Sequence, residues 1–282
     1  MFNYVKRKIS NTANALNERL HFRKFSLPDF LIIGAQKSGT TALYYYLIQH
    51  PGIIPPRIKE IHYFGNPSNR MKGPYWYTSH FCTVSYKKSL ERTLGYPPVT
   101  GEATPYMHKP YLPKYVHELL PSAKLIAIFR DPADRAYSQY NHQCRHGREQ
   151  LSFEDAIMQS PVKIPEEQMN DEWLYHNNNL RSYITRGLYA DHLERWYEYF
   201  ARDRILIINS NEFFSKPEEI LNNVLEFLNM PEYNFDIKRL SKNAGNYTSK
   251  MNEKTREYLY SIFKPYNRRF SELTGLDFGW PV

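Results

Sequence analysis

Short apolar runs alternate along this chain with longer stretches in which apolar residues recur at helical spacing. Three runs, Phe30–Ile33, Leu125–Phe129 and Ile205–Ile208, contain no polar residue, which is typical of strands buried on both faces of a parallel sheet. A fourth and weaker run spans Val99–Ala103. Helical patterns follow the three strong runs over residues 40–49, 132–145 and 217–228, and two further helices are expected over residues 189–200 and 252–273.

The alternation of strands and helices predicts an α/β fold, a single domain whose central parallel sheet is flanked by helices. Pro132 and Pro217 stand at the first position of their helices, where proline is favoured, and Gly275 stands where the last helix should end. We divide the chain into a basic, helical N-terminal extension over residues 1–27 and one domain over residues 28–282. Ligands of such sheets bind beyond the carboxyl ends of the strands.

The N-terminal extension combines a weakly apolar helical face with Lys6, Arg7 and other basic residues, against a single acid, Glu18. This pattern allows a weak contact with a membrane surface. A solvated helix that packs loosely on the domain is the simpler interpretation.

The net charge of the chain favours anionic partners. Lys and Arg number 37 against 29 Asp and Glu, and the resulting charge of +8 fits a nucleotide, an acidic polysaccharide, a nucleic acid or a membrane surface. The two cysteines, Cys82 and Cys144, exclude a disulfide scaffold and have no metal-type spacing, which favours a reducing compartment. No apolar run approaches the ~20 residues that span a bilayer, so a soluble, cytoplasmic protein is expected. The oligomeric state is left open.

The turn between the first strand and the first helix has the composition of a phosphate-binding loop. Gly34 and Gly39 permit a tight turn, and the following helix presents unpaired N–H groups at its positive end. Side-chain donors for the same anion are Lys37, Ser38, Thr40 and Thr41. A Walker loop has its lysine directly after the second glycine, whereas Lys37 precedes Gly39 by two residues. No acidic strand end stands out as a Mg²⁺ ligand, so the pattern departs from that of nucleoside triphosphatases.

A second candidate anion site follows the second strong strand. Arg130 stands directly after Phe129, where its guanidinium suits a bidentate phosphate contact, and Ser138 offers a hydroxyl about two helical turns later. Alone, an Arg-Asp-Pro turn is more often the site of a surface salt bridge. Two anion sites at two strand ends, however, indicate one ligand that carries phosphates at both ends.

The order and wording of these motifs resemble those of the sulfotransferases that use 3′-phosphoadenosine 5′-phosphosulfate (PAPS). The segment Lys59–Phe64 resembles the Lys-Glu-x-x-Phe-Phe region of glycan sulfotransferases, and Gly101–Tyr106 resembles their substrate-cleft strand. Residues 134–143 are very similar to the N-sulfotransferase domain of the heparan sulfate deacetylase/sulfotransferase. Arg186–Tyr189 and the closing Asp277–Trp280 are also family-like, so the resemblance covers roughly residues 28–280.

This resemblance implies a P-loop-like sulfotransferase fold, PAPS as the donor, 3′,5′-ADP as the product, and no metal. It assigns the loop from Gly34 to Thr41 to the 5′-phosphosulfate, with Lys37 at the leaving oxygen. It assigns Arg130 and Ser138 to the 3′-phosphate. Glu60 matches the family's catalytic glutamate and would act as the general base.

Three further parts of the site are implied by the same resemblance. His142 matches a histidine near the acceptor in the N-sulfotransferase domain, and His62 stands where related O-sulfotransferases use histidine, so either could assist proton transfer or orient the sugar. A late loop with Gly245, Asn246 and Tyr247 is expected to close over the donor. Related enzymes have a Gly-Arg pair with basic neighbours there and, in the animal domain, a nearby disulfide, whereas this chain has Gly245-Asn246 and no cysteine pair.

The acceptor is expected to be a saccharide, and O- and N-sulfation stay open because Glu60 suits both. No nucleic-acid partner is expected. Two other functions stay open from the residues: a P-loop-type nucleotide kinase or triphosphatase, and a non-catalytic module that binds polyanions. Tight binding of Mg²⁺-ATP would favour the first, and glycan binding without transfer from PAPS would favour the second.

Overall fold

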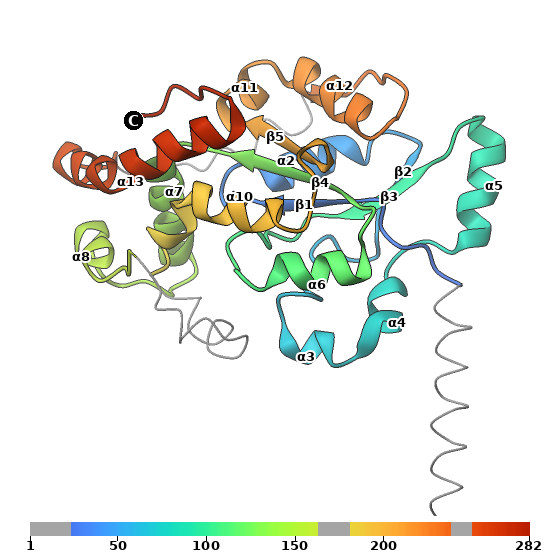
Figure 1. Cartoon of the computed structure of the whole chain (residues 1–282), viewed down its shortest axis with the longest axis horizontal. Coiled ribbons are helices and arrows are strands. Elements are labelled where there is room, and N and C mark those ends of the chain that lie inside the picture. The colour runs from blue at the N-terminus through green and yellow to red at the C-terminus, as the bar shows by residue number, and fades with distance from the viewer. Residues whose placement is uncertain (1–23, 163–180, 238–249) are drawn as a thin grey trace, which may run out of the picture.

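The fold is built on a five-stranded sheet, seen in the computed structural model of Figure 1, which describes residues 24–162, 181–237 and 250–282. The strands lie in the order β2-β3-β1-β4-β5. Their bounds are β1 Phe30–Gly34, β2 Ile53–Ile54, β3 Val99–Glu102, β4 Lys124–Phe129 and β5 Ile205–Asn209. Neighbouring strands pair in parallel, as the alternating sequence pattern predicts.

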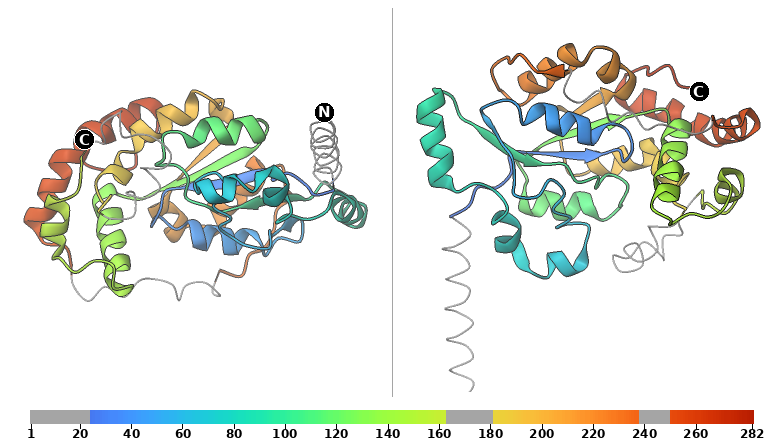
Figure 2. Two further views of the ribbon diagram at one scale, coloured as in Figure 1. Left: turned by 90° about the horizontal axis from the view of Figure 1, so that it is seen from below. Right: turned by 180° about the vertical axis from the view of Figure 1, so that it is seen from behind.

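Helices connect the strands and cover both faces of the sheet, as the two views of Figure 2 show. Their bounds are α2 Thr40–Leu47, α3 Pro67–Arg70, α4 Gly73–Thr78, α5 Val84–Leu94, α6 Leu112–Leu119, α7 Pro132–Arg145, α8 Phe153–Met158, η2 Thr185–Gly187, α10 Tyr189–Tyr197, η3 Arg202–Arg204, α11 Ser210–Ser215, α12 Pro217–Phe227 and α13 Glu253–Thr274. Sequence signals mark their ends. The Asp131 carboxylate accepts from the Asp134 N–H at 2.9 Å where α7 begins, and Gly275 ends α13 at a left-handed φ of 72°.

Alternate side chains of the buried strands pack into two hydrophobic layers, one on each face of the sheet, because successive strand residues point to opposite faces. Leu31 and Ile33 of β1 pack in one layer with side chains of α6, α10 and α13. Their neighbours Phe30 and Ile32 pack in the other layer with side chains of α2, α11 and α12. A third cluster joins α7, α8 and α13.

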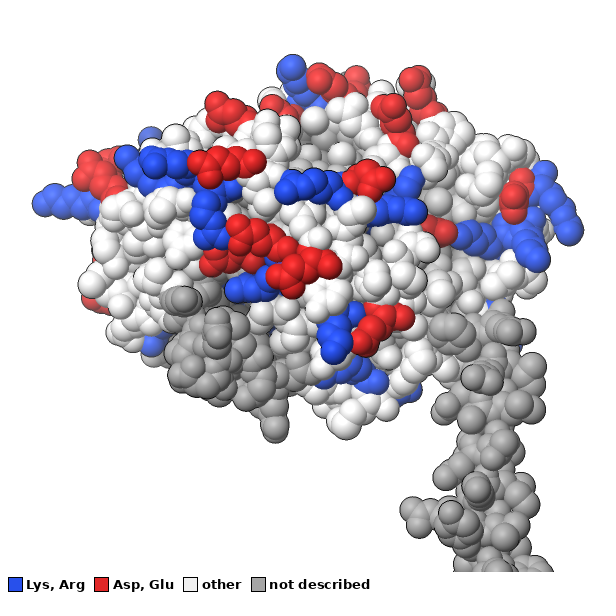
Figure 3. Space-filling model, in the orientation of Figure 1, with Lys and Arg blue, Asp and Glu red and all other residues white. Residues whose placement is uncertain are grey.

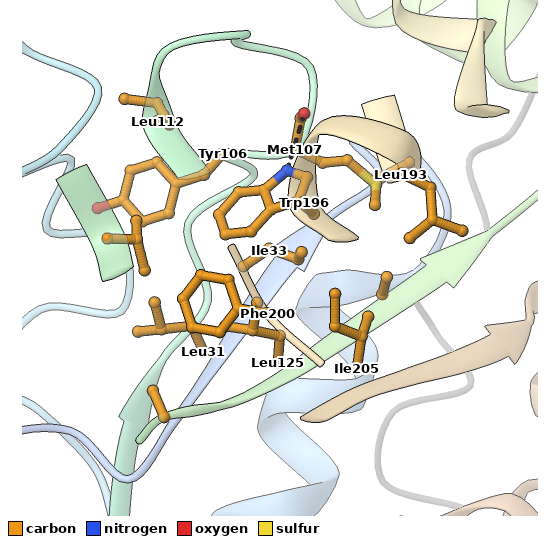
Figure 4. Packing of buried hydrophobic residues seen from close by; sticks show 14 of the residues in the cluster. Leu31, Ile33, Tyr106, Met107, Leu112, Leu125, Leu193, Trp196, Phe200 and Ile205 are labelled. Atoms are coloured by element: carbon orange, nitrogen blue, oxygen red, sulfur yellow. Dashed lines mark hydrogen bonds between the residues drawn. The ribbon is translucent and has the colours of Figure 1, made fainter. Parts of the chain in front are cut away.

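Trp196 of α10 ties one of these layers to the backbone beside the carboxyl end of β1 (Figure 4). Its fully buried side chain donates from Nε1 to the Met107 carbonyl at 3.2 Å. The Met107 N–H in turn donates to the Ile33 carbonyl at 2.8 Å. A Cβ on Gly34 would lie 2.9 Å from the Met107 Cβ, so this close approach requires glycine at that position.

The strand order brings three functional segments to one edge of the sheet. β1 lies between β3 and β4, with Leu31 opposite Glu102 and Gly34 opposite Ala127. The carboxyl ends of these three strands lead into the candidate phosphate loop, the segment after Glu102 and the Arg130 turn. Parallel strands end at the same edge, so these segments are neighbours.

The structure confirms the predicted α/β class, the parallel sheet and the helices that follow the main apolar pattern. Some limits differ, since α2 ends at Leu47 and α10 ends at Tyr197, earlier than expected. The N-terminal extension lies outside the described residues up to residue 23. Within the described ranges, no helix is both long enough and apolar enough to cross a membrane.

Candidate active site

The phosphate loop, residues 34–41, links β1 to α2 and is held from two sides. Its Ala35 N–H donates to the Ile128 carbonyl of β4 at 2.7 Å. Its Ser38 carbonyl accepts from the Ser210 hydroxyl of α11 at 2.7 Å. These bonds fix the loop backbone relative to the elements on either side.

The local geometry of this loop fits a bound anion. Lys37 and Gly39 adopt left-handed φ values of 70° and 111°, which turn the chain sharply into α2. Gly39 is the N-cap of α2 and supplies no side-chain acceptor to the N–H groups of the first turn. The Ser38 hydroxyl is buried and has no hydrogen-bond partner among the described residues. An anion on the loop would satisfy both kinds of donor.

The second predicted anion site lies at the neighbouring strand end. Arg130 directly follows β4, and its carbonyl accepts from the Tyr189 hydroxyl at 3.0 Å. Ser138 lies on α7 and is 4% exposed. Because Ala35 is bonded to β4 itself, the start of the phosphate loop and the Arg130 turn belong to adjacent strand ends, as the sequence predicts. Their contacts with a 3′-phosphate stay a prediction.

Glu60 lies between β2 and α3, where two nitrogen groups hold its carboxylate. Lys59 Nζ is 2.6 Å from Oε1, and His62 Nε2 is 3.4 Å from Oε2. Burial raises the pKa of Glu60, but the hydrogen bonds from His62 and Lys59 and the Lys59 charge outweigh it and lower the pKa to about 2. Lys59 Nζ also donates to Thr41 Oγ1 at 2.8 Å. The structure therefore joins an ionised Glu60 to the phosphate loop.

Glu102, the last residue of β3, supports this segment and was not singled out by the sequence analysis. Its fully buried carboxylate accepts four hydrogen bonds, from the Ile61 N–H at 3.1 Å and from the hydroxyls of Thr104 at 2.5 Å, Tyr77 at 2.8 Å and Tyr106 at 3.2 Å. Burial raises its pKa despite these bonds. The available sequence signal was an acid at the end of a buried strand. Its bond to Ile61 fixes the backbone next to Glu60.

His142 lies in the last turn of α7, and the charge of Lys37 in the phosphate loop acts on its side chain. Burial and the charge of Lys37 lower its pKa to about 4, and His146, Arg145 and Arg148 add to the shift. The ring centroids of His142 and His146 are 4.3 Å apart. The structure thus brings His142 near Lys37, and it brings His62 to Glu60.

A small cavity of about 10 Å³ lies beside the phosphate loop and is lined by polar and apolar side chains, and the sequence analysis did not predict it. Arg186 Nη1 donates to Gln36 Oε1 of the loop. His192 Nε2 bonds to the Thr185 carbonyl at 2.8 Å, and burial together with the Arg195 charge lowers the pKa of His192 to about 3. His108 also lines this cavity. Arg186 was noticed in the sequence as family-like, but not as a support of the loop.

The structure gives little information on two further predictions, the late loop over the donor and the absence of a metal. Gly245, Asn246 and Tyr247 fall in residues 238–249, outside the described residues, so their contact with the donor stays a prediction. In the part of the chain that the structure describes, no group of three or more His, Cys, Asp or Glu side chains is placed to hold a metal ion.

The loop, the Arg130 turn and the Glu60 segment lie in a stretch of sequence that matches one known family. The family described as "sulfotransferase domain" matches residues 27–265. The chain belongs to the sulfotransferase family. Sulfotransferases of this family use PAPS, and the match confirms the family and the fold that the sequence motifs predict.

Curated relatives match at about 30% identity. The bifunctional heparan sulfate N-deacetylase/N-sulfotransferase 4 of Mus musculus is 32% identical over 279 residues, which cover 88% of this chain and 30% of that protein. The bifunctional heparan sulfate N-deacetylase/N-sulfotransferase 1 of Caenorhabditis elegans is 32% identical over 248 residues, which cover 83% and 26%. This sulfotransferase therefore spans less than a third of the length of these relatives.

A solved structure matches over nearly its full length. The sulfotransferase from Alicyclobacillus acidocaldarius superposes with a TM-score of 0.66 at 28% identity, covering 89% of this chain and 97% of that chain. The sulfotransferase fold therefore accounts for the sheet and the helices around it.

Proposed function

We propose that this sulfotransferase moves the sulfuryl group of PAPS to an amine or hydroxyl of an anionic saccharide. One observation carries the proposal: Lys59 hydrogen bonds both to Thr41 of the phosphate loop and to the ionised Glu60. A donor cradle and a base are thereby joined at one sheet edge, which is the arrangement that group transfer requires.

The residues at this edge of the sheet would have three separate roles: binding the 5′ end of PAPS, binding its 3′-phosphate and accepting a proton from the acceptor. PAPS, when bound, would supply the sulfuryl group, and the leaving group would be 3′,5′-ADP, which retains the 5′-phosphate. The first-turn N–H groups of α2, the Ser38 hydroxyl and Lys37 would hold the 5′ end, with Lys37 neutralising the leaving oxygen. Arg130 and Ser138 would hold the 3′-phosphate. Glu60 would accept the proton of the acceptor's amine or hydroxyl as the new bond to sulfur forms.

The charge around His142 supports an anionic acceptor. Burial is the largest cause of the lowered pKa of His142, and the positive charges of Lys37, Arg145 and Arg148 lower it further. A neutral His142 among cations can orient a sugar hydroxyl while the cations attract carboxylate or sulfate groups. The printed names of the curated relatives, which refer to heparan sulfate, point to the same class of acceptor.

A kinase or nucleoside triphosphatase is disfavoured by the state of Glu102. This is the carboxylate at the end of the strand beside β1, where a Mg²⁺ ligand would be sought. Both of its oxygens already accept hydrogen bonds from protein donors, among them Ile61 and Tyr77. A Mg²⁺ ion would have to displace these buried bonds.

A non-catalytic polyanion binder is disfavoured on the face shown in Figure 3, where blue and red side chains are interspersed. Among the described ion pairs, Arg269 of α13 pairs with Asp191 at 2.9 Å and with Glu194 at 2.5 Å, both from α10. Interspersed charges of both signs on this face do not form an extended anion-binding surface.

The direct test is a transfer assay with labelled PAPS. The acceptor panel pairs an N-desulfated heparan-type polysaccharide with its N-acetylated form, and includes an uncharged polysaccharide and a phenol. We expect transfer to the anionic polysaccharides; preference for the N-desulfated form would indicate N-sulfation. Lys37→Met should lower kcat about 10²- to 10³-fold, since it removes charge stabilisation at the leaving oxygen. Lys216→Met, which alters an exposed lysine of the α12 N-terminus, is the matched control.

Calorimetry separates the alternatives. The proposal requires binding of 3′,5′-ADP without added metal. Tight binding of Mg²⁺-ATP and no response to 3′,5′-ADP would establish the kinase alternative. Binding of sulfated glycans and 3′,5′-ADP without transfer to any acceptor would establish the non-catalytic module.

A further inference from the structure

Lys59 is the side chain that connects the phosphate loop with Glu60. Its ammonium donates to Thr41 Oγ1 at 2.8 Å and lies 2.6 Å from Glu60 Oε1. Its backbone is anchored, because the Lys59 carbonyl accepts from the Ala103 N–H at 3.1 Å just beyond β3. An ammonium carries three N–H groups, so these two bonds leave one for a further acceptor.

The place of Thr41 indicates what that further acceptor would be. Thr41 belongs to the first turn of α2, where N–H groups without a side-chain cap would face a bound anion. The 5′-phosphosulfate of PAPS carries two negative charges, one on the phosphate and one on the sulfate, and the 5′-phosphate of 3′,5′-ADP is a dianion. Either group attracts an ammonium more strongly than one carboxylate does, because the Coulomb energy scales with charge. The flexible four-carbon stem of lysine allows the head group to turn while the backbone stays anchored.

We propose that Lys59 is a switch that releases Glu60 when the phosphate loop is filled. With the loop empty, the ammonium holds the Glu60 carboxylate. With a phosphate anion on the loop, the ammonium turns to the anion, and Glu60 is left to receive the acceptor's proton. The inference rests on the proposed function, since it takes the loop as the donor site.

The release matters because a carboxylate held by a cation is a weak base. Burial raises the pKa of Glu60, and the bonds from His62 and Lys59 with the Lys59 charge lower it to about 2. Among the described residues, the charged or titratable groups that shift the pKa of Glu60 are Lys59 and His62. From α2, the Thr41 hydroxyl contacts Lys59 and not Glu60 itself. Departure of the ammonium would raise the pKa of Glu60, and proton-accepting strength rises with pKa.

The test follows the protonation of Glu60 directly, without relying on turnover. The full chain is labelled with ¹³C at the glutamate side-chain carboxyl, and the Glu60 signal is assigned by its loss in Glu60→Gln. The signal is then titrated with and without saturating 3′,5′-ADP. We expect no titration of Glu60 above about pH 4 in the free protein, and a midpoint higher by at least about one unit when 3′,5′-ADP is bound.

Two variants separate the switch from the repulsion that any bound anion exerts on a carboxylate. In Lys59→Met, the Glu60 midpoint in the free protein should already be higher than in the wild type, although the His62 bond remains, and 3′,5′-ADP should raise it less than in the wild type. Lys59→Arg keeps a cation and should restore part of the ligand-dependent shift. Lys87→Met is the matched control, because Lys87 bonds to Asp29 at 2.7 Å at the opposite end of β1. It should leave the Glu60 titration unchanged.

The outcomes distinguish this inference from the proposed function. If calorimetry detects no binding of 3′,5′-ADP, the donor site itself is wrong and the switch is wrong with it. If 3′,5′-ADP binds but the Glu60 midpoint does not move, or moves equally in Lys59→Met, Lys59 is a static partner of Glu60. A larger ligand-dependent shift in the wild type than in Lys59→Met supports the switch.

Discussion

Two carboxylates at the same sheet edge have opposite surroundings. Glu60 is 34% exposed at its side chain and is held by Lys59 and His62, so that its pKa falls to about 2 although burial acts to raise it. Glu102 is fully buried among neutral donors, and burial raises its pKa. Ile61 links the two residues, because it directly follows Glu60 in the chain and its N–H donates to the Glu102 carboxylate. The Lys59 charge and the hydrogen bonds from Lys59 and His62 keep one carboxylate ionised, whereas neutral donors fix the other in place.

Of the substitutions that test this difference between the two carboxylates, the one at Glu60 should have the largest effect, and that effect should be on kcat. Glu60→Gln keeps the shape of the side chain and removes the proton acceptor, so kcat should fall about 10²- to 10⁴-fold. The thermal unfolding midpoint should fall only slightly, because the Glu60 side chain is partly exposed and an exposed ion pair such as that with Lys59 contributes little. Initial rates at saturating PAPS and acceptor, with a thermal scan, check both statements. Undiminished transfer would show that Glu60 is not the base.

The second effect, on stability, belongs to Glu102. Glu102→Gln places an amide N–H₂ against hydroxyl donors such as Tyr77, so the free energy of unfolding should fall by about 2–3 kcal/mol. The unfolding midpoint should fall by about 2–4 °C for each kcal/mol lost. Where the variant is folded, kcat should stay within about tenfold of the wild type, because Glu102 acts on the proton acceptor through the backbone.

Tyr77→Phe provides the matched control for this change. It removes a single donor to Glu102 and should cost about 1 kcal/mol. If Glu102→Gln were as stable as the wild type and as inactive as Glu60→Gln, then Glu102 would take part in the chemistry and would not be a structural counterpart of Glu60.

The two carboxylates also show what the sequence could predict. Glu60 was found because it lies in a short motif, Lys59–Phe64, whose neighbours in sequence are its neighbours in space. The environment of Glu102 comes from residues far along the chain, since Ile61 and Tyr77 approach it only in the folded protein. The link between Lys59 and Thr41 is likewise tertiary. No local pattern encodes such contacts.

The same distinction explains which elements of the fold were predictable. The run Leu125–Phe129 of β4 is fully buried, so its uninterrupted apolar sequence identifies it. α5 has no buried residue and therefore no apolar stripe by which a helix is recognised. β2 consists of two residues, too few to display a period. Elements with a clear burial pattern could therefore be predicted from the sequence, whereas peripheral elements without such a pattern could not.

The smallest expected effect is the pH dependence of stability, which should have opposite signs for the two carboxylates. The folded pKa of Glu60, about 2, is below the ordinary value of 4.5, so its stabilising contribution is present above pH 4.5 and is lost as pH falls towards 2. The folded pKa of Glu102 is above 4.5, so the folded state binds its proton more strongly. Its contribution therefore declines as pH rises from 4.5 through that higher pKa.

Urea unfolding of the wild type, Glu60→Gln and Glu102→Gln between pH 3 and 7 measures these contributions by difference, because glutamine does not titrate. The advantage of the wild type over Glu60→Gln should shrink as the pH falls below 4.5. Its advantage over Glu102→Gln should instead grow as the pH falls towards 4.5 from above and level off below 4.5, since the protonated Glu102 no longer carries a buried charge. Two differences that changed in the same direction would mean that the surroundings of Glu60 and Glu102 do not act oppositely, because each slope reports the sign of one pKa shift.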